Sequence, residues 1–361
     1  MTKTNQTNTI KTRMAPKTEP GFWVQSMPIY IGVMLLIVGL LAGFGLRAAF
    51  FEAPVIANPD QNNDTNQTNS IEVKVFTDQT CAICNETTSF ELLLQKRGVA
   101  YTRTSIDISN PQNRATFDSL DANTVPTVSV NAADLKKKDA ALEATLSRQF
   151  KTKNGQLIME EIELYAVTKP DYPIPVKFVQ NPSPAACVTA QTPLVWEFGD
   201  FLCPECYDTL PQVVQLESDF NNQIQYDFKH MIYFGQDTDS ERVANSAECA
   251  RDQNKFTQYK KTIFEQFFGL NFPSWDPARQ LVAATQAQIP DQNQFKTCID
   301  SNQHFDKVNR TNGTDITIAR QFKVAMVPAF LIDCQYLVLR PANIANTLCG
   351  LHPALAACDN Q

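Results

Sequence analysis

Two pairs of cysteines in this chain have the Cys-x-x-Cys spacing that suits thiol–disulfide exchange. The first pair is Cys81 and Cys84, and the second pair is Cys203 and Cys206. At this spacing one sulfur can attack a substrate disulfide, and the other can then resolve the mixed disulfide that forms. Because the attacking species is a thiolate, each pair also needs surroundings that favour the anion. The sequence therefore predicts two candidate redox sites.

Each cysteine pair follows a strand-like run, at residues 72–76 for the first pair and 194–198 for the second. A Val-Pro step that heads an apolar run comes later in the chain, at Pro126 and at Pro328. A strand, a cysteine pair at the start of a helix and a Pro-headed strand form the layout of a thioredoxin-like redox site. Because this layout occurs twice, the sequence predicts an α/β protein with two tandem thioredoxin-like domains.

The first domain is predicted at residues 71–168, because strand and helix signals alternate there. Strands are expected at 72–76, 101–107 and 127–130, with helices between them, which predicts a parallel-cored sheet. Residues 169–192 are rich in proline and are expected to form a semi-rigid linker between the domains.

The second domain is predicted at residues 193–361, with a helical insertion between its two halves. In the first domain the proline of the Val-Pro step follows the first cysteine by 45 positions, whereas in the second domain it follows by 125 positions. The difference of 80 positions matches a stretch with helical patterning at about 236–322. The second domain is therefore expected to be a thioredoxin core with this stretch inserted.

The N-terminal region has the features of a membrane anchor. Residues 20–46 carry no charge. About 20 apolar residues suffice for a helix to cross a bilayer, so residues 27–50 are predicted to form one transmembrane helix. Four basic residues precede the uncharged run at 20–46 and only Arg47 follows it closely, which predicts that residues 1–26 are cytoplasmic and that the later domains are extracytoplasmic. Residues 51–70 are expected to be a flexible tether because they are mostly polar towards the C-terminal end.

A cleaved signal peptide is the alternative reading of this region. Residues 55–57, Val-Ile-Ala, could serve as a small-residue cleavage site. The long basic segment and the long apolar run favour an uncleaved signal anchor at the cell membrane. Ten cysteines in an exported chain fit an oxidising compartment. The net charge of −7 argues against a nucleic-acid partner, which would need a basic face.

The segment around the second cysteine pair resembles a known family. Residues 196–207, Trp-Glu-Phe-Gly-Asp-Phe-Leu-Cys-Pro-Glu-Cys-Tyr, resemble the active-site segment of DsbA-type thiol:disulfide oxidoreductases. The helical insertion and the Val-Pro-Ala-Phe segment at 327–330 strengthen the resemblance, which covers about residues 190–352. It implies that the Val-Pro bonds at Pro126 and Pro328 are cis. One departure is Glu205, which stands where the family often has histidine.

The chemistry expected at the second pair assigns a role to each residue. Cys203 should be the exposed attacking thiol at a helix N-terminus, where the helix dipole stabilises its thiolate. Cys206 should be the buried resolving thiol. The resemblance implies that Glu197 is a buried acid that shuttles protons to Cys206; the alternative is an ordinary glutamate at a strand edge. For Cys81 and Cys84 no buried acid is evident, so a degenerate or accessory first domain is a serious alternative.

Six further cysteines are candidates for structural disulfides. Relatives of the DsbA type imply a disulfide between Cys249 and Cys298. Cys334 and Cys349 make a second plausible pair, which leaves Cys187 and Cys358 for each other. Connectivity cannot be deduced from sequence alone, so these pairings are expectations.

Other readings of the cysteine pairs are a plain structural disulfide or half of a zinc site. The two pairs are much farther apart than the roughly 15–20 residues typical of paired zinc motifs. The three histidines, at 230, 304 and 352, lie far from both pairs in the sequence. No metal and no cofactor are therefore expected.

The sequence as a whole predicts a membrane-anchored extracytoplasmic thiol:disulfide oxidoreductase. Its expected partners are cysteine-containing exported proteins or peptides, a membrane or soluble redox partner, and the lipid bilayer through one helix. The alternatives are a non-catalytic peptide-binding adaptor or chaperone with structural disulfides, and a metal-delivery protein. The sequence does not show whether the net reaction is oxidation, reduction or isomerisation of disulfides, because that depends on the reduction potentials and on the redox partner.

Overall fold

The computed structural model describes residues 70–84, 87–168, 174–180, 187, 192–232, 239–269 and 274–360. The predicted cytoplasmic tail, transmembrane helix and nearly all of the tether lie outside these residues. Among the helices that are described, none is both long and apolar enough to cross a bilayer. Residues 66–361 form one compact unit.

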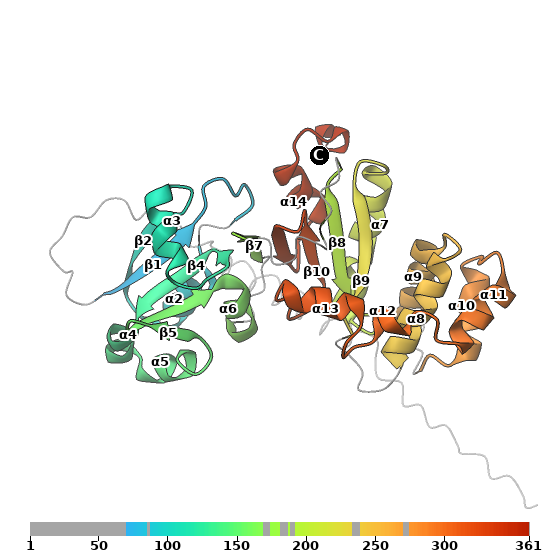
Figure 1. The fold of residues 1–361 in the computed structure, drawn as a ribbon, viewed down its shortest axis with the longest axis horizontal. Helices are drawn as coiled ribbons and strands as arrows, with labels where there is room; N and C mark the ends of the chain where they lie inside the picture. The colour runs from blue at the N-terminus through green and yellow to red at the C-terminus, as the bar shows by residue number, and fades with distance from the viewer. Residues whose placement is uncertain are drawn as a thin grey trace, which may run out of the picture. The chain divides into compact units, whose positions relative to one another are not determined.

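The first sheet has the strand order β2-β1-β4-β6-β5 (Figure 1). Its strands are β1 (Ile71–Thr77), β2 (Tyr101–Asp107), β4 (Thr127–Asn131), β5 (Lys151–Lys153) and β6 (Gln156–Glu160). Its helices are α2 (Ser89–Arg97), α3 (Pro111–Asp118), α4 (Ala132–Lys138), α5 (Ala140–Leu146) and α6 (Glu161–Thr168). Only β1 and β2 run parallel, because the chain returns antiparallel in β4, β6 and β5. The parallel core that the sequence predicts is therefore limited to one strand pair.

Helix α2, which follows the first cysteine pair, has a capping box at its start and a glycine at its end. The Thr88 side chain accepts a hydrogen bond from the backbone of Glu91, and the Glu91 carboxylate accepts one from the backbone of Thr88. This capping box satisfies two backbone donors at the start of α2. Gly98 ends the helix with a φ of 67°, a left-handed conformation that glycine adopts without steric cost.

The second sheet has the order β3-β7-β11-β10-β8-β9. Its strands are β3 (Thr124–Val125), β7 (Ile174–Phe178), β8 (Leu194–Gly199), β9 (Gln225–His230), β10 (Ala329–Ile332) and β11 (Tyr336–Leu339). Strands β8 and β9 run parallel, and every other pair is antiparallel. Helix α7 (Pro204–Asp219) follows β8, and α14 (Ile344–Leu351) follows β11.

Two strands of the second sheet come from outside the predicted second domain. Strand β7 lies in residues 169–192, which were expected to be only a linker, and β3 lies in the predicted first domain. This proline-rich segment buries alternate apolar side chains, as a strand does: Ile174, Val176 and Phe178. The sequence did not predict this strand, because prolines within a sheet are usually confined to edge strands and to turns.

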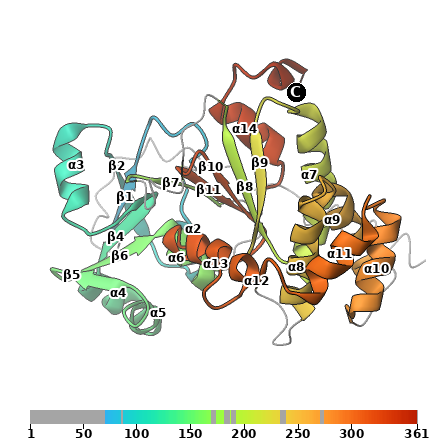
Figure 2. The same cartoon turned by 45° about the vertical axis from the view of Figure 1, so that its right-hand side comes forward.

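The helices between β9 and β10 occupy the region where the insertion was predicted. They are α8 (Asp239–Arg251), α9 (Phe256–Phe264), the π-helix η1 (Glu265–Gly269), α10 (Pro277–Gln286), α11 (Gln292–Asp300), α12 (Phe305–Val308) and α13 (Thr314–Gln321). Figure 2 shows α8, α9, α10 and α11 gathered as one group of helices. A disulfide between Cys249 and Cys298 joins α8 to α11, as the family resemblance implied.

The other expected disulfide pairings are wrong. Cys334 is bonded to Cys187 and Cys349 is bonded to Cys358. Cys334 lies in the turn between β10 and β11, and the neighbouring carbonyl of Gln335 accepts a hydrogen bond from Phe178 at the end of β7. The segment after β7 therefore starts beside the turn that holds Cys334. Cys349 instead pairs locally, because the chain folds back after α14 into a short 3₁₀ helix (Ala356–Asn360).

Candidate redox active site

Cys203 and Cys206 are placed by the turn that joins β8 to α7. The carboxylate of Asp200 accepts a hydrogen bond from the backbone of Leu202 at 2.9 Å, and Cys203 then acts as the N-cap of α7. Pro204 follows at the first helical position, where its missing N–H costs little. Glycine is favoured at position 199, the last residue of β8, because a Cβ atom there would lie 2.6 Å from the ring of Phe228.

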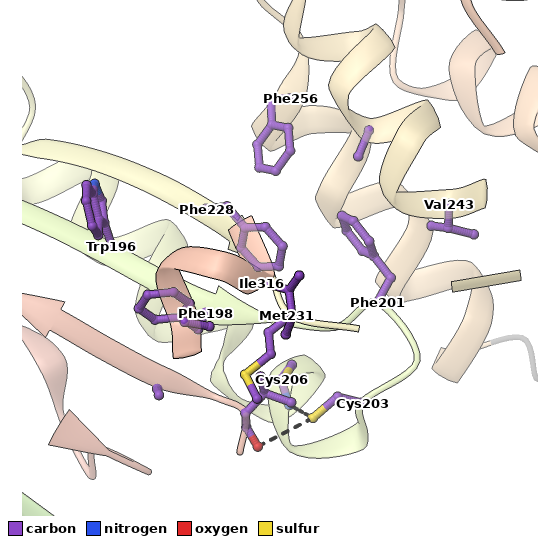
Figure 3. Packing of buried hydrophobic residues seen from close by; sticks show 14 of the residues in the cluster. Trp196, Phe198, Phe201, Cys203, Cys206, Phe228, Met231, Val243, Phe256 and Ile316 are labelled. Atoms are coloured by element: carbon purple, nitrogen blue, oxygen red, sulfur yellow. Dashed lines mark hydrogen bonds between the residues drawn. The ribbon is translucent and has the colours of Figure 1, made fainter. Parts of the chain in front are cut away.

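The two thiols of this site are unbonded, whereas the other eight cysteines form disulfides. The Cys203 sulfur accepts a hydrogen bond from the backbone N–H of Cys206 at 3.1 Å. It also lies 3.9 Å from the carbonyl oxygen of Val327, as the dashed lines in Figure 3 show. A backbone donor at the helix N-terminus is the arrangement that stabilises a thiolate.

The expectation that Cys203 is exposed is wrong, because both sulfur-bearing residues are fully buried. They belong to an apolar cluster with Phe201 and Met231, and Figure 3 shows Met231 beside Cys206. The sequence places Cys203 at a helix start, but the side chains that cover it come from other parts of the chain. Access of a substrate to Cys203 therefore requires this cover to move.

Both Val-Pro bonds, at Pro126 and at Pro328, are cis, as the family resemblance implied. The residue after β11, Arg340, donates its backbone N–H to the carbonyl of Pro328 at 3.3 Å. Its guanidinium lies 3.5 Å from the carboxylate of Glu205, and a carboxylate oxygen of Glu205 lies 3.6 Å from the Cys203 sulfur. Arg340 therefore offsets part of the negative charge that Glu205 brings to the thiol, a role the sequence did not reveal.

The resolving thiol is held in its protonated form. Burial raises the pKa of Cys206 well above that of a free thiol, and the hydrogen-bonded Cys203 and the charge of Glu197 raise it further. A group that accepts the proton of Cys206 is therefore needed before this sulfur can attack. The family resemblance proposes Glu197 for this role, and the charge of Glu197 is one of the causes that raise the pKa of Cys206.

Glu197 lies on β8 and is completely buried in a cluster of three polar side chains. Its carboxylate accepts hydrogen bonds from the ammonium of Lys260 and from the hydroxyl of Tyr226. The Lys260 nitrogen also lies 2.9 Å from the Tyr226 oxygen. Burial and the charge of Glu197 raise the pKa of Tyr226, so the phenol stays a donor. Among the described residues, the second oxygen of Glu197 has no hydrogen-bond partner.

Sequence reasoning missed Lys260 and Tyr226. Lys260 stands on the apolar face of α9, with buried Phe256 four residues before it and buried Phe264 four residues after it. A lysine on such a face is costly unless it is paired, and that position was the available signal. Tyr226 lies on β9 opposite Val195, a register that only the folded sheet reveals.

The first cysteine pair differs from the second in state and in position. Cys81 and Cys84 are joined by a disulfide, and they precede a helix whose N-cap is Thr88. The prediction of a cysteine pair at a helix start therefore describes Cys203 and not Cys81. Cys81 is buried and Cys84 is half-buried.

A buried acid does lie near the first site, although the sequence did not indicate it. Glu161 begins α6, donates its backbone N–H to the carbonyl of Pro126 at 3.1 Å, and accepts hydrogen bonds from the backbone and hydroxyl of Ser89. It therefore joins the cis-proline loop to the first turn of α2. Burial raises the pKa of Glu161 to about 7.

Glu161→Gln is expected to change how stability depends on pH. An acid with a raised pKa binds a proton more readily in the folded chain, so it destabilises the fold as pH rises from its unfolded pKa to its folded pKa. At about 1.4 kcal/mol per pH unit, the wild-type chain should lose about 3 kcal/mol more unfolding free energy than Glu161→Gln between pH 4.5 and pH 7. Urea unfolding at several pH values measures this difference. Glu72→Gln, at an exposed carboxylate, is the control, and equal pH slopes in wild type and Glu161→Gln would contradict the prediction.

One group of possible metal ligands occurs among the described residues, and it lies away from both cysteine pairs in the sequence. It consists of Cys249, Cys298 and His304. The two sulfurs are bonded to each other, so they cannot serve as thiolate ligands in this state.

Comparisons with known proteins find similarity over the second half of the chain. The family model described as thioredoxin matches residues 189–341. No curated protein matches the chain.

Several solved structures are similar in part. The thiol-disulfide exchange protein alpha-DsbA2 from Wolbachia pipientis is 18% identical, with a TM-score of 0.38, and the match covers 46% of this chain and 84% of that one. Reduced DsbA from Mycobacterium tuberculosis is 19% identical with a TM-score of 0.37, covering 49% and 93%. The reduced disulfide bond oxidoreductase DsbG from the same organism is 21% identical with a TM-score of 0.37, covering 49% and 88%. The chain is thus similar to a thioredoxin family over residues 189–341, and its fold is mixed α/β and thioredoxin-like.

Proposed function

We propose that this chain is a membrane-anchored, extracytoplasmic thiol:disulfide oxidoreductase built from two thioredoxin-like domains in tandem. One observation carries the proposal: Cys203 and Cys206 are free thiols at the N-terminus of α7, with the Cys203 sulfur hydrogen-bonded to the Cys206 backbone beside the cis-Pro328 loop. The apolar run at 29–46, inside the predicted helix at 27–50, supports the anchor, and the positive-inside rule supports the extracytoplasmic location.

The reaction proceeds through a mixed disulfide. The Cys203 thiolate attacks one sulfur of a substrate disulfide, a bond forms between these sulfurs, and the other substrate sulfur leaves as a thiolate that takes a proton. Cys206 then gives its proton to the Glu197 cluster and attacks Cys203. A Cys203–Cys206 disulfide forms, and the second substrate sulfur is released. Run in reverse, the same steps oxidise a substrate dithiol.

The surroundings of the site suit unfolded protein substrates. Tyr207 and Phe268 stack with ring centroids 5.2 Å apart, and both are only partly buried. Leu202 and Met326 are also partly buried apolar residues of this cluster. Apolar side chains of this kind can hold an extended peptide while its sulfur reacts. The substrates are therefore cysteine-containing exported proteins or peptides, and a membrane or soluble redox partner restores the starting state.

A redox titration of the full chain tests this function. In glutathione buffers of graded potential, Cys203 and Cys206 are expected to interconvert between dithiol and disulfide as one two-electron couple, which alkylation and mass spectrometry report. The chain should also exchange disulfides with a two-cysteine peptide. If the pair never oxidises and no peptide is turned over, a non-catalytic adaptor becomes the better description. The midpoint potential distinguishes an oxidase from a reductase or isomerase.

A further inference from the structure

The turn before the first cysteine pair is fixed to the second sheet of the same chain. The ammonium of Lys177, on β7, lies 2.7 Å from the Asp78 carboxylate and 2.9 Å from the Thr80 hydroxyl. The Asp78 and Lys177 side chains are each only 11% exposed. An ion pair that is shielded from water and supported by a further hydrogen bond holds its two elements together more firmly than an exposed pair.

The backbone edge beside the cis-Pro126 loop is also occupied by the chain itself. Strand β3 pairs antiparallel with β7, with Val125 opposite Lys177, and the carbonyl of Asn123 accepts a hydrogen bond from Val179 at 2.8 Å. An extended peptide binds a sheet by adding a strand to such a free edge. Because β7 already fills this edge, a peptide from another protein cannot add there without displacing it.

The loop between Cys81 and Cys84 lies against the last turn of α14, which carries one cysteine of a second disulfide. A Cβ atom built on Gly350, in the last turn of α14, would lie 3.4 Å from Cγ2 of Ile83. Ile83 directly precedes Cys84, and Gly350 directly follows Cys349, whose partner is Cys358. Cys84, Cys349 and Cys358 are all half-buried, so neither disulfide is sealed in the core.

We propose that Cys81–Cys84 is an internal redox centre whose partner is the Cys349–Cys358 disulfide of the same chain. The proposal rests on the proposed function only in that Cys81–Cys84 undergoes the same kind of exchange, with an external small dithiol as its reductant. The contact of Ile83 with Gly350 brings the segment that carries Cys84 against the segment that carries Cys349. Because β7 pairs with β3, an extended protein substrate cannot pair with the edge beside the first site, so the first site reacts with the internal partner. Extended protein substrates react at Cys203.

The exchange balances without a further reagent once the dithiol has acted. The dithiol is oxidised to its disulfide, and Cys81 and Cys84 become thiols. One of their thiolates attacks Cys349 or Cys358, a mixed disulfide forms, the 349–358 bond breaks, and the departing sulfur takes a proton. The remaining thiolate of the first pair then attacks the mixed disulfide. Cys81–Cys84 is restored, and two electrons and two protons have passed to Cys349 and Cys358.

Single-cysteine variants of the first pair test this step in the full chain. Cys84→Ser and Cys81→Ser, each made together with Cys203→Ser and Cys206→Ser, leave one thiol beside the C-terminal disulfide. In at least one of them, non-reducing digestion and mass spectrometry should find residue 81 or 84 linked to residue 349 or 358, with a new free thiol at the other. The yield of this link should not depend on protein concentration. A lone thiol that stays free beside an intact 349–358 disulfide, or links only between molecules, overturns the proposal.

A second variant tests the route without altering any cysteine of the exchange. Gly350→Phe, added to the trapping variant, inserts a ring against Ile83 and is expected to lower the yield of the internal link about tenfold, because exchange needs close alignment of the sulfurs. Circular dichroism checks that the fold is retained. An unchanged yield in a folded Gly350→Phe chain overturns the proposed contact. The glutathione titration of Cys203 and Cys206 in the wild-type chain reports separately on the proposed function.

Discussion

Cys206→Ser is expected to leave the chain covalently joined to its substrates, and Cys203→Ser is expected to abolish exchange at this site. The Cys203 sulfur accepts a hydrogen bond from the Cys206 backbone N–H and caps the start of α7, so it is the sulfur placed to attack a substrate. Without Cys206, the mixed disulfide that Cys203 forms has no internal thiol to resolve it. Without Cys203, the buried Cys206, whose pKa burial raises, is a poor nucleophile at neutral pH.

The two variants form a matched pair, because each replaces one sulfur by oxygen at neighbouring buried positions. Turnover of a two-cysteine peptide by Cys203→Ser should fall by about three orders of magnitude or more, since the attacking group itself is lost. Non-reducing gels and mass spectrometry should detect the Cys206→Ser adduct, and a reductant should release it. If Cys203→Ser still turns over the peptide at the wild-type rate, the reactive thiol lies elsewhere in the chain.

Lys260→Met is expected to destabilise the fold by about 3–5 kcal/mol, the usual cost of leaving a buried charge without its partner. The Lys260 side chain is 2% exposed and the Glu197 side chain is 0% exposed, so water cannot replace the lost ammonium. Tyr226 would remain as a hydrogen-bond donor to Glu197, but it carries no positive charge. Urea unfolding at neutral pH measures the change.

The neighbouring lysine supplies the control for this prediction. The Lys261 side chain is 54% exposed and lies 3.8 Å from Glu265 on the surface of the same helix region. Lys261→Met should therefore change the unfolding free energy by no more than about 1 kcal/mol. Adding Glu197→Gln to Lys260→Met should recover part of the loss, because the buried carboxylate charge is removed. Equal costs for Lys260→Met and Lys261→Met would contradict the account of the buried cluster.

The mixed α/β, thioredoxin-like fold was predictable because its signals are local. The run at 194–198 is apolar apart from Glu197, Pro204 suits a first helical turn, and Gly98 suits a helix end, so each element could be located from its own residues. The helical stretch between β9 and β10 was predictable from the distance between Cys203 and Pro328. These features depend on neighbours in the sequence and not on the arrangement of distant segments.

Most of the features that the sequence did not reveal depend on contacts between distant segments. Strand β7 pairs with β11 about 160 residues later, and no local pattern encodes that partner. The bond of Cys187 to Cys334 spans 147 positions and follows from where β7 lies, whereas Cys349 pairs with Cys358 only nine positions later. The burial of Cys203 depends on other elements, since its sulfur lies 3.9 Å from the Val327 carbonyl and its apolar cluster includes Met231. Glu161 became a candidate only when the fold placed it between Ser89 and the Pro126 loop.

The position of β7 between β3 and β11 has a consequence for dividing the chain. A fragment that ends near residue 168 would keep β3 but lose the strand that covers its edge. A fragment that begins near residue 193 would leave β11 with an open edge and Cys334 without its partner. Open edges recruit other strands and promote aggregation. Cutting the chain in the proline-rich segment therefore disrupts the second sheet, on whichever side of β7 the cut is made. The composition of this segment nevertheless makes it look like a domain boundary.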